Sequence, residues 1–363
     1  MARLGDICKK ASSSVAQKDL EEREGQYPIY GASGLIKYVD FYHQEKPYVA
    51  VVKDGAGVGR VMQLPAKSSV IGTMQYIIPN DGVNVSYLAY ALEHMNLSKY
   101  YTGATIPHIY FKDYCNEAMP DHGKDEQKNI AEILDKVNSL VTLRKQQLVK
   151  LDELVRARFV EMFGNVLCDS DLPLVQLKEL ADIGSSKRIY ANEYVESGIP
   201  FYRSKEIREL GAGLKPSVEL FIKQERYDEI KAKYGVPEKG DILIAAIGAT
   251  IGYSWIVDTD KPFYYKDGNL IILSTKNNVN PIFLNHTMGL LIENFKSKGV
   301  AGSAQLALTI EKLEKMMVIN PSIDLQNQFA AFVEQTDKSK SAIQESLDKL
   351  ETLKKALMQK YFG

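Results

Sequence analysis

The sequence predicts an α+β fold (mixed α/β) in which two similar globular domains are joined by two long antiparallel coiled-coil helices, an internal pseudo-two-fold repeat. Residues 126–164 and 325–363 align without a gap at an offset of 199 positions; 9 of the 39 pairs are identical, and both segments close in Phe-Gly. Both segments lack proline and internal glycine, which favours long helices. The stretches that precede them share short motifs in the same order.

These observations divide the chain into four parts. We predict a first globular domain (1–123), a central helix (124–164), a second globular domain (165–322) and a C-terminal helix (323–363). The shared motifs are Tyr-Pro-Ile-Tyr at 27–30 with Ile-Pro-Phe-Tyr at 199–202, glycine-rich turns at 55–59 and 248–252, and Thr-Gly-Ala at 102–104 with Ala-Gly-Ser at 301–303. Between the first two motifs the second domain is longer by 21 residues, so we expect similar cores with different surface insertions.

The globular parts contain short apolar runs that predict strands. Runs rich in β-branched and aromatic residues, bounded by turn-forming residues, lie at 48–52, 70–78, 241–247 and 270–273. The charged stretch 217–235 predicts a helix within the longer second domain. Gly55 and Gly248 each follow a strand, where glycine usually marks a tight turn or a bulge.

Both long segments carry apolar residues at alternating steps of three and four, the pattern of a coiled coil. Each helix of about 40 residues would span roughly 60 Å. Because isolated helices of this kind would expose an apolar stripe to water, we expect them to pair with each other, antiparallel. The predicted pairing residues are Ile130, Leu134, Val137, Leu148, Leu151, Val155, Phe329, Val333, Ile343, Leu347, Leu350 and Leu357.

Composition excludes several classes of protein. The 363 residues are 45% hydrophobic, enough for proper cores, yet no apolar run is long enough to span a membrane. Three distant cysteines fit a reducing compartment, so we expect a cytoplasmic protein without disulfides. Net charge is −1, so if the chain binds nucleic acid, local patches or a partner must supply much of the attraction.

No catalytic constellation is found in the sequence. A phosphate-binding G-x-x-x-x-G-K-[ST] loop, an H-E-x-x-H zinc motif and a G-x-S-x-G nucleophile elbow are absent. No His/Cys spacing indicates a metal site. Glu229-Ile230-Lys231 has the E-x-K form of some nucleases but lies in a charged, helix-like stretch with no acidic partner in context. Asn320-Pro321 is followed by Ser322, so the signature of amino methyltransferases is missing.

One ordered set of motifs occurs twice and identifies a family. A glycine-containing turn (102–105; 302–305) precedes an apolar stretch ending in proline (Pro120; Pro321), and then a helix that starts with glutamine (Gln127; Gln326) and closes in Phe-Gly. In this respect the chain resembles the specificity subunit of type I restriction–modification systems, over essentially its whole length.

The resemblance implies two target-recognition domains, each reading one half of a split double-stranded DNA sequence. It implies that the helices set the distance between the halves and dock two modification (methyltransferase) subunits, with restriction subunits joining them. No catalytic residue and no metal site are then expected here, and no cofactor in this chain; S-adenosylmethionine, ATP and Mg would belong to the partner subunits. The outward lysines expected on the docking faces include Lys136, Lys145, Lys150, Lys349 and Lys355.

Base readout requires donors, acceptors and planar groups on a rigid platform, and phosphate contacts require cations and hydroxyls. Residues of these types flank the shared glycine turns and the strand ends. In the first domain the candidates are Lys37, Tyr38, Lys53, Arg60, Thr73, Gln75, Tyr76, Thr102, Thr105 and His108. In the second domain they are Lys187, Arg188, Tyr190, Arg203, Lys205, Tyr253, Tyr265, Lys266, Asp267, Asn269, Ser303 and Gln305.

Three other interpretations remain open at this point. The near-neutral charge favours two adaptor domains on a coiled-coil strut that bind no nucleic acid. A nuclease or methyltransferase activity in the second domain is another. A third is the recognition subunit of a fused, type II-like restriction–methylation enzyme, which uses similar domains.

Overall fold

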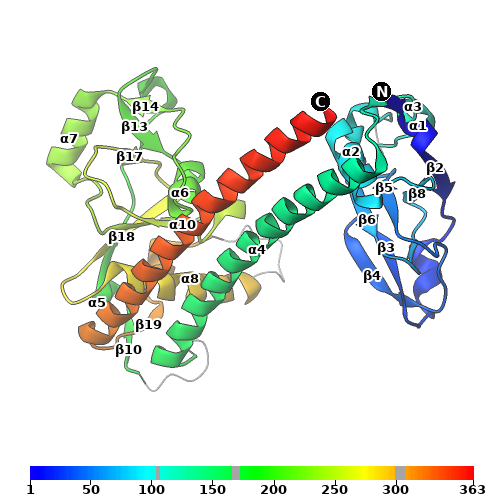
Figure 1. Cartoon of the computed structure of the whole chain (residues 1–363). Helices are drawn as coiled ribbons and strands as arrows, with labels where there is room; N and C mark the ends of the chain where they lie inside the picture. The colour runs from blue at the N-terminus through cyan, green and yellow to red at the C-terminus, as the bar shows by residue number, and fades with distance from the viewer. Residues whose placement is uncertain (104–106, 166–171, 299–306) are drawn as a thin grey trace. The chain divides into compact units, whose positions relative to one another are not determined.

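The computed structural model describes residues 1–103, 107–165, 172–298 and 307–363 (Figure 1). The chain forms two compact units, Met1–Leu148 with Ala342–Gly363, and Val149–Ser341. Each unit contains one globular domain and a part of each long helix, α4 (Lys124–Phe163) and α10 (Ile323–Phe362). Among the described residues no helix is long and apolar enough to cross a membrane.

The first domain is built on an antiparallel sheet with the strand order β2-β8-β5-β6 and a second sheet ordered β4-β3-β7. The second sheet is mixed, because β3 and β7 pair in parallel. Strand bounds are β1 (Ala2–Arg3), β2 (Cys8–Ser12), β3 (Tyr27–Gly31), β4 (Gly34–Val39), β5 (Tyr48–Val52), β6 (Val61–Leu64), β7 (Ser69–Val70), β8 (Met74–Pro79) and β9 (Ala118–Met119). The helices are α1 (Leu4–Ile7), η1 (Gln17–Leu20), α2 (Val85–Met95), η2 (Leu97–Tyr100) and α3 (Phe111–Tyr114).

The second domain repeats this topology. Its antiparallel sheet has the order β11-β18-β15-β16, and its mixed sheet β12-β14-β13-β17 again contains one parallel pair, β13 with β17. The strands are β10 (Leu174–Gln176), β11 (Ala181–Gly184), β12 (Tyr194–Val195), β13 (Ile199–Tyr202), β14 (Phe221–Ile222), β15 (Ile242–Ala245), β16 (Ser254–Ile256), β17 (Tyr264–Tyr265), β18 (Leu270–Thr275) and β19 (Met317–Ile319). The helices are α5 (Leu177–Leu180), η3 (Ala191–Glu193), α6 (Ser204–Gly211), α7 (Gln224–Tyr234), η4 (Gly248–Thr250), α8 (Pro281–Lys298) and α9 (Ile310–Glu314).

Each domain packs against the long helices through one core helix. In the first unit, α2 shares a buried cluster with Leu134 of α4 and Phe362 of α10. In the second unit, Phe283 of α8 lies in one cluster with Phe163 and Phe329. Aromatic rings fill both junctions, and burying one such side chain contributes about 1.5–3 kcal/mol. The Phe-Gly endings that align in the sequence therefore anchor helix ends to domains.

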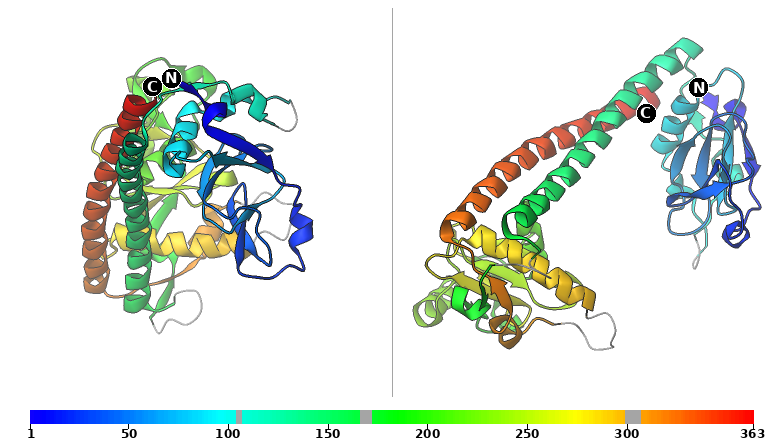
Figure 2. Two further views of the ribbon diagram at one scale, coloured as in Figure 1. Left: turned by 45° about the vertical axis from the view of Figure 1, so that its right-hand side comes forward. Right: turned by 90° about the horizontal axis from the view of Figure 1, so that it is seen from below.

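The long helices pair antiparallel within each unit, and Figure 2 shows them side by side. In the first unit Lys145 forms an ion pair with Glu351 at 2.8 Å. In the second unit Lys340 forms one with Asp152 at 2.7 Å. All twelve predicted pairing residues are buried or half-buried. Several of them, such as Leu134 and Phe329, are buried in clusters shared with a globular domain, so the assignment of all twelve to the seam of the helix pair stays a prediction.

Two predicted elements differ from the structure. The run 70–78 is not one strand, because β7 ends at Val70 and β8 begins at Met74, with Gly72 donating its backbone N–H to the Val15 carbonyl between them. The stretch 217–235 is helical only from Gln224, and its apolar Phe221–Ile222 pairs as β14 with both β12 and β13. The apolar pair Phe221–Ile222 is a strand because it pairs with two neighbouring strands, although the surrounding composition favours a helix. The division into four parts remains a prediction, since the compact units cut across both long helices.

Candidate functional site

Both domains place a glycine turn directly after a central strand. The N–H of Gly59 donates to the Val52 carbonyl at 2.8 Å, and that of Gly252 donates to the Ala245 carbonyl at 2.9 Å. Gly55 and Gly59 have φ of 89° and 83°, and Gly248 and Gly252 have 68° and 90°. Residues with a Cβ rarely adopt this backbone. The two turns therefore have the same geometry, and what differs between them is the side chains around them.

In the first domain, a His–Asp pair lies next to the turn. The Nδ1 of His108 hydrogen-bonds the Asp54 carboxylate, and the Pro107 carbonyl accepts from the N–H of Gly55. The imidazole packs on Tyr110, whose ring centroid is 4.2 Å away, and the Lys112 ammonium lies 5.3 Å from the same ring. Tyr110 is half exposed. This arrangement presents donors, a cation and a ring on one surface, as a nucleic-acid contact requires.

Among its described residues, the second domain has no counterpart of this pair. The backbone bridge between Asp54 and His108 corresponds to a bridge between Ile247 and Ala307, which carry no polar side chains. Similar backbones thus present different chemistry, which is what two readers of different sequences need.

A basic and aromatic cluster lies elsewhere on the second domain. Arg188 pairs with Asp267 at 2.8 Å, which joins two segments that were both predicted to contact DNA. The Lys187 ammonium lies 4.2 Å from the ring centroid of Tyr234, the last residue of α7, and the Lys233 ammonium lies 5.3 Å from it. Lys233 and Tyr234 were not predicted from the sequence.

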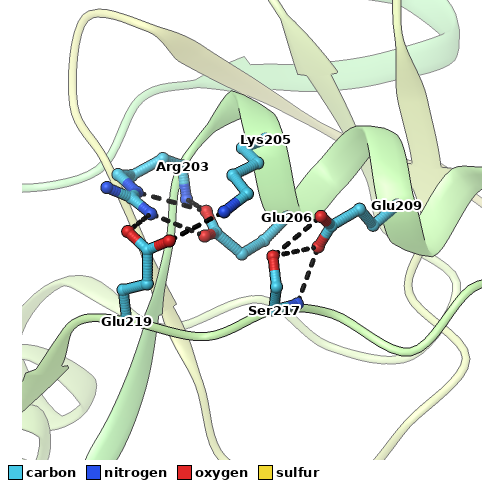
Figure 3. A network of polar contacts seen from close by, with 6 residues as sticks. All are labelled: Arg203, Lys205, Glu206, Glu209, Ser217 and Glu219. Atoms are coloured by element: carbon cyan, nitrogen blue, oxygen red, sulfur yellow. Dashed lines mark hydrogen bonds and ion pairs between the residues drawn. The ribbon is translucent and has the colours of Figure 1, made fainter. Parts of the chain in front are cut away.

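A polar network at the start of α6 pairs two other predicted DNA contacts, Arg203 and Lys205, with carboxylates of the same domain (Figure 3). Arg203 binds the fully buried Glu206 at 2.8 Å and also Glu219 at 2.9 Å, and Lys205 binds Glu219 at 2.7 Å. The hydrogen bonds from Lys205 and Arg203 lower the pKa of Glu219 to about 2. Both cations are thus neutralised by partners within the domain, and their role as phosphate ligands is not supported.

A third cation on α6 has no carboxylate partner among the described residues. The Arg208 guanidinium lies 5.9 Å from the ring centroid of Tyr253, which follows the second glycine turn and is 46% exposed. In the first domain, Arg60 occupies the matching position after its turn and donates to the Ala32 carbonyl at 2.6 Å. A guanidinium therefore lies beside each turn, supplied by a different element in each domain.

Three predicted contacts are contradicted by burial. Gln75, Tyr76 and Tyr265 are 2%, 1% and 4% exposed. Gln75 hydrogen-bonds the Tyr114 hydroxyl, and the Tyr76 hydroxyl accepts from the N–H of Val70 at 3.1 Å. All three lie on strands, β8 and β17, whose side chains at these positions are buried, so they do not reach a DNA groove.

The remaining candidates are at least partly accessible. Lys37 donates to the Leu20 carbonyl at 2.9 Å, whereas Lys53 pairs weakly with Asp54 at 3.8 Å. The other accessible candidates, exposed or half-buried, are Tyr38, Thr73, Thr102, Tyr190, Lys266 and Asn269. Thr105, Ser303 and Gln305 lie outside the described residues. The unpredicted Tyr110, Lys112, Lys233 and Tyr234 share one signal, a tyrosine next to or two positions from a lysine in the sequence.

Each domain is fastened to a long helix by a glutamine. Gln127 accepts from the N–H of Asn84 at 3.1 Å and donates to the His122 carbonyl at 2.9 Å. Gln326 accepts from the N–H of Asn280 at 2.9 Å and donates to the Pro321 carbonyl at 2.9 Å. The side chains are 8% and 1% exposed. A domain fixed in this way keeps its orientation on the helix that carries it.

The outward faces of the helices are only partly polar. Lys145, Lys150 and Lys349 form ion pairs with helix carboxylates, and Lys136 and Lys355 have none among the described residues. Exposed apolar residues of α4 accompany them: Ile133, Leu140 and Leu143 in the first unit, and Val149, Leu154 and Val160 in the second. An apolar stripe of this kind on a helix is typical of a surface that a partner covers.

Comparison with known proteins gives one consistent result. A family model described as the type I restriction modification DNA specificity domain matches residues 1–153 and 170–354. A putative type I restriction enzyme specificity subunit of Haemophilus influenzae is 26% identical over 333 residues, covering 89% of this chain and 83% of that protein. The MjaVIII specificity subunit of Methanocaldococcus jannaschii is 25% identical over 398 residues, covering 99% and 90%.

The fold has a solved counterpart as well. The crystal structure of the type I restriction–modification S subunit from M. genitalium superposes with a TM-score of 0.62 at 18% identity, covering all of this chain and 95% of that one. At this identity the likeness concerns the fold alone.

Proposed function

The chain belongs to the type I restriction–modification DNA specificity family, and from that premise we propose that its two domains each read one half of a split DNA target. The observation that supports this division of labour is the pair of glycine turns. Their backbones coincide in geometry, but one adjoins the Asp54–His108 pair and the other adjoins Tyr253 and Arg208. A shared frame with different donors and acceptors suits two readers of different sequences.

The long helices act in this proposal as the spacer between the two half-sites. Their antiparallel pairing within each unit and the glutamine junctions support a fixed mounting for each domain. The gap in the DNA target then follows from helix length rather than from any base contact.

The helices also dock two modification (methyltransferase) subunits in this proposal. Support comes from the exposed apolar residues of α4, among them Leu143 in the first unit and Leu154 in the second, 48% and 49% exposed. Mixing the chain with its modification subunit and measuring the mass tests this assignment. A two-to-one complex is expected, and a chain that remains alone contradicts it.

Catalysis resides on the partner subunits in this proposal. The chain orients DNA for them, and S-adenosylmethionine, ATP and Mg bind outside it. Incubating the isolated chain with DNA and Mg²⁺ or S-adenosylmethionine should give no turnover, and any methylation or cleavage by the chain alone would contradict the assignment.

Methylation mapping tests the function as a whole. A host that carries this chain and its modification subunit should acquire methylation at a split motif with two short half-sites and a constant gap. A contiguous motif, or methylation that does not depend on this chain, would overturn the proposal.

A further inference from the structure

The second domain carries a surface for which the first domain has no matching element. Between β3 and β5 the first domain has only the strand β4, whereas between β13 and β15 the second has α6, β14 and α7. Helix α7, within this insertion, ends with Lys233 and Tyr234. The next residue, Gly235, has a φ of 79°. This end of α7 meets Lys187 from a separate segment.

The two lysines of this surface differ from most cations nearby. Arg188, Arg203, Lys205 and Arg226 all pair with carboxylates at 2.7–2.9 Å. Lys187 and Lys233 form no ion pair in the part of the chain that the structure describes, and both are exposed. Their ammonium groups lie instead 4.2 and 5.3 Å from the centroid of Tyr234, which is 52% exposed. Two unneutralised cations are thus held on one exposed ring.

The elements that carry them are fixed to the domain. The N–H of Lys187 donates to the hydroxyl of the buried Tyr264 at 2.7 Å. Helix α7 is joined to η3 by the ion pair of Arg226 with Glu193 at 2.8 Å and buries Ile230 in the domain core. Little ordering is then needed when an anion binds, which favours affinity.

We propose that Lys187, Lys233 and Tyr234 form a clamp for the phosphodiester backbone of duplex DNA at the half-site read by the second domain. This inference rests on the proposed function of the chain. Ammonium groups bind phosphate as point charges without reading sequence, and an exposed ring beside them adds contact with the sugar. The clamp adds affinity on one half-site only, because the first domain has no α7.

Lysines near a helix C-terminus also interact favourably with the helix dipole, so Lys233 could instead serve to stabilise α7. The chain offers a matched control in Lys231, an exposed lysine of the same last turn two positions earlier. Two positions turn a helix by about 200°, so Lys231 points away from the face of Lys233. The dipole account predicts equal effects of the two lysines, whereas the clamp predicts an effect of Lys233 alone.

The test compares the complex of the full chain with its modification subunit against the same complex carrying K187Q/K233Q. Binding is measured from low to moderate salt on a duplex with the split motif found by methylation mapping and on a scrambled duplex of equal length. The double variant should lower the slope of log affinity against log salt by about 0.9 per lysine, nearly equally on both duplexes. The K231Q complex should show the same slope of log affinity against log salt as the complex of the wild-type chain.

The outcomes separate the clamp from the function on which it rests. If the unmodified complex binds its split motif selectively and K187Q/K233Q leaves the slope unchanged, the clamp is wrong while the function stands. If the double variant fails to assemble with the modification subunit at full thermal stability, the lysines belong to a protein interface and the clamp is overturned. An altered methylation motif would equally overturn it, because phosphate contacts carry no sequence information.

Discussion

Gln326 makes the same two hydrogen bonds as Gln127, 199 positions earlier in the chain: each accepts from the N–H of an asparagine that begins a core helix and donates to a carbonyl five residues before itself. Each glutamine is the fourth residue of its long helix. The duplicated feature is thus a junction as well as a helix.

The junctions predict a loss of stability when a glutamine is removed. Gln127→Ala and Gln326→Ala each leave a part-buried N–H and a carbonyl without their partner, at a cost of about 1–3 kcal/mol. The loss should be larger for Gln326, which is the more buried of the two. Thermal unfolding of the full chain measures it. The controls are Gln146→Ala and Gln328→Ala, at exposed positions of the same helices, which should change the midpoint little. Equal shifts in variants and controls would contradict the role of the junctions.

The first glycine turn predicts that a side chain at Gly59 is not tolerated. A Cβ there would lie 2.5 Å from the backbone nitrogen of Ser98, in a residue with φ of 83°. Gly59→Ala should therefore lower the free energy of unfolding by about 1–3 kcal/mol and weaken binding to the half-site of the first domain. Gly123→Ala, where a Cβ meets nothing within 4 Å, is the matched control. If both variants unfold at the same temperature, the turn does not require glycine at position 59.

The sequence predicted the parts of this fold that depend on repetition and periodicity. An offset of 199 residues aligned two helices that both begin and end at that offset, Lys124 with Ile323 and Phe163 with Phe362. Glycine spacing located both turns, because left-handed backbone constrains residue type strongly. These signals are local or are repeated in the chain itself.

Predicting the surface was harder, because accessibility depends on partners far apart in the chain. Gln75 is polar but bonds Tyr114, and Arg203 is a cation but bonds the buried Glu206. In contrast, Lys233 and its neighbour Tyr234 were not predicted, because they lie in a charged helix, and only the fold brings Lys187 to the ring of Tyr234. Residue type shows what a side chain can bind, whereas the fold determines whether it is already bound.

The junction of the second unit predicts a dependence of stability on pH. Burial, together with the nearby charges of Arg156 and Lys340, lowers the pKa of His286 to about 4. The imidazole packs on Phe159 and Phe329 at 4.8 and 5.1 Å between centroids. Since the ordinary pKa is 6.5, the folded state binds fewer protons than the unfolded chain between pH 4 and 6.5. Stability is therefore complete above about pH 6.5 and falls, by ~1–3 kcal/mol, as the pH drops toward 4.

Replacing this histidine should remove that dependence. Tyr90 takes the corresponding place on α2, six residues after Asn84 as His286 follows Asn280, so an aromatic side chain suits the position. In His286→Phe, the unfolding midpoint should change less between pH 4.5 and 6.5 than it does in the wild-type chain. This pH window is set by the lowered pKa of His286. His94→Phe, on α2 of the first unit, is the control and should leave the pH dependence in place. A profile that stays steep in His286→Phe would assign the dependence to other groups.

The spacer role predicts that the gap in the DNA target follows helix length. Removing residues 142–148 from α4 and 344–350 from α10 deletes one matched heptad from each helix, because Lys354 meets Asn138 and Lys340 meets Asp152 on either side. Seven residues of helix span about 10 Å, which is about three base pairs of duplex at 3.4 Å each. Methylation mapping with the shortened chain should give unchanged half-sites and a gap shorter by about three. Deleting the heptad from α4 alone should abolish methylation, since the helices then lose their register. Altered half-sites with an unchanged gap would mean that the helices do not set the spacing.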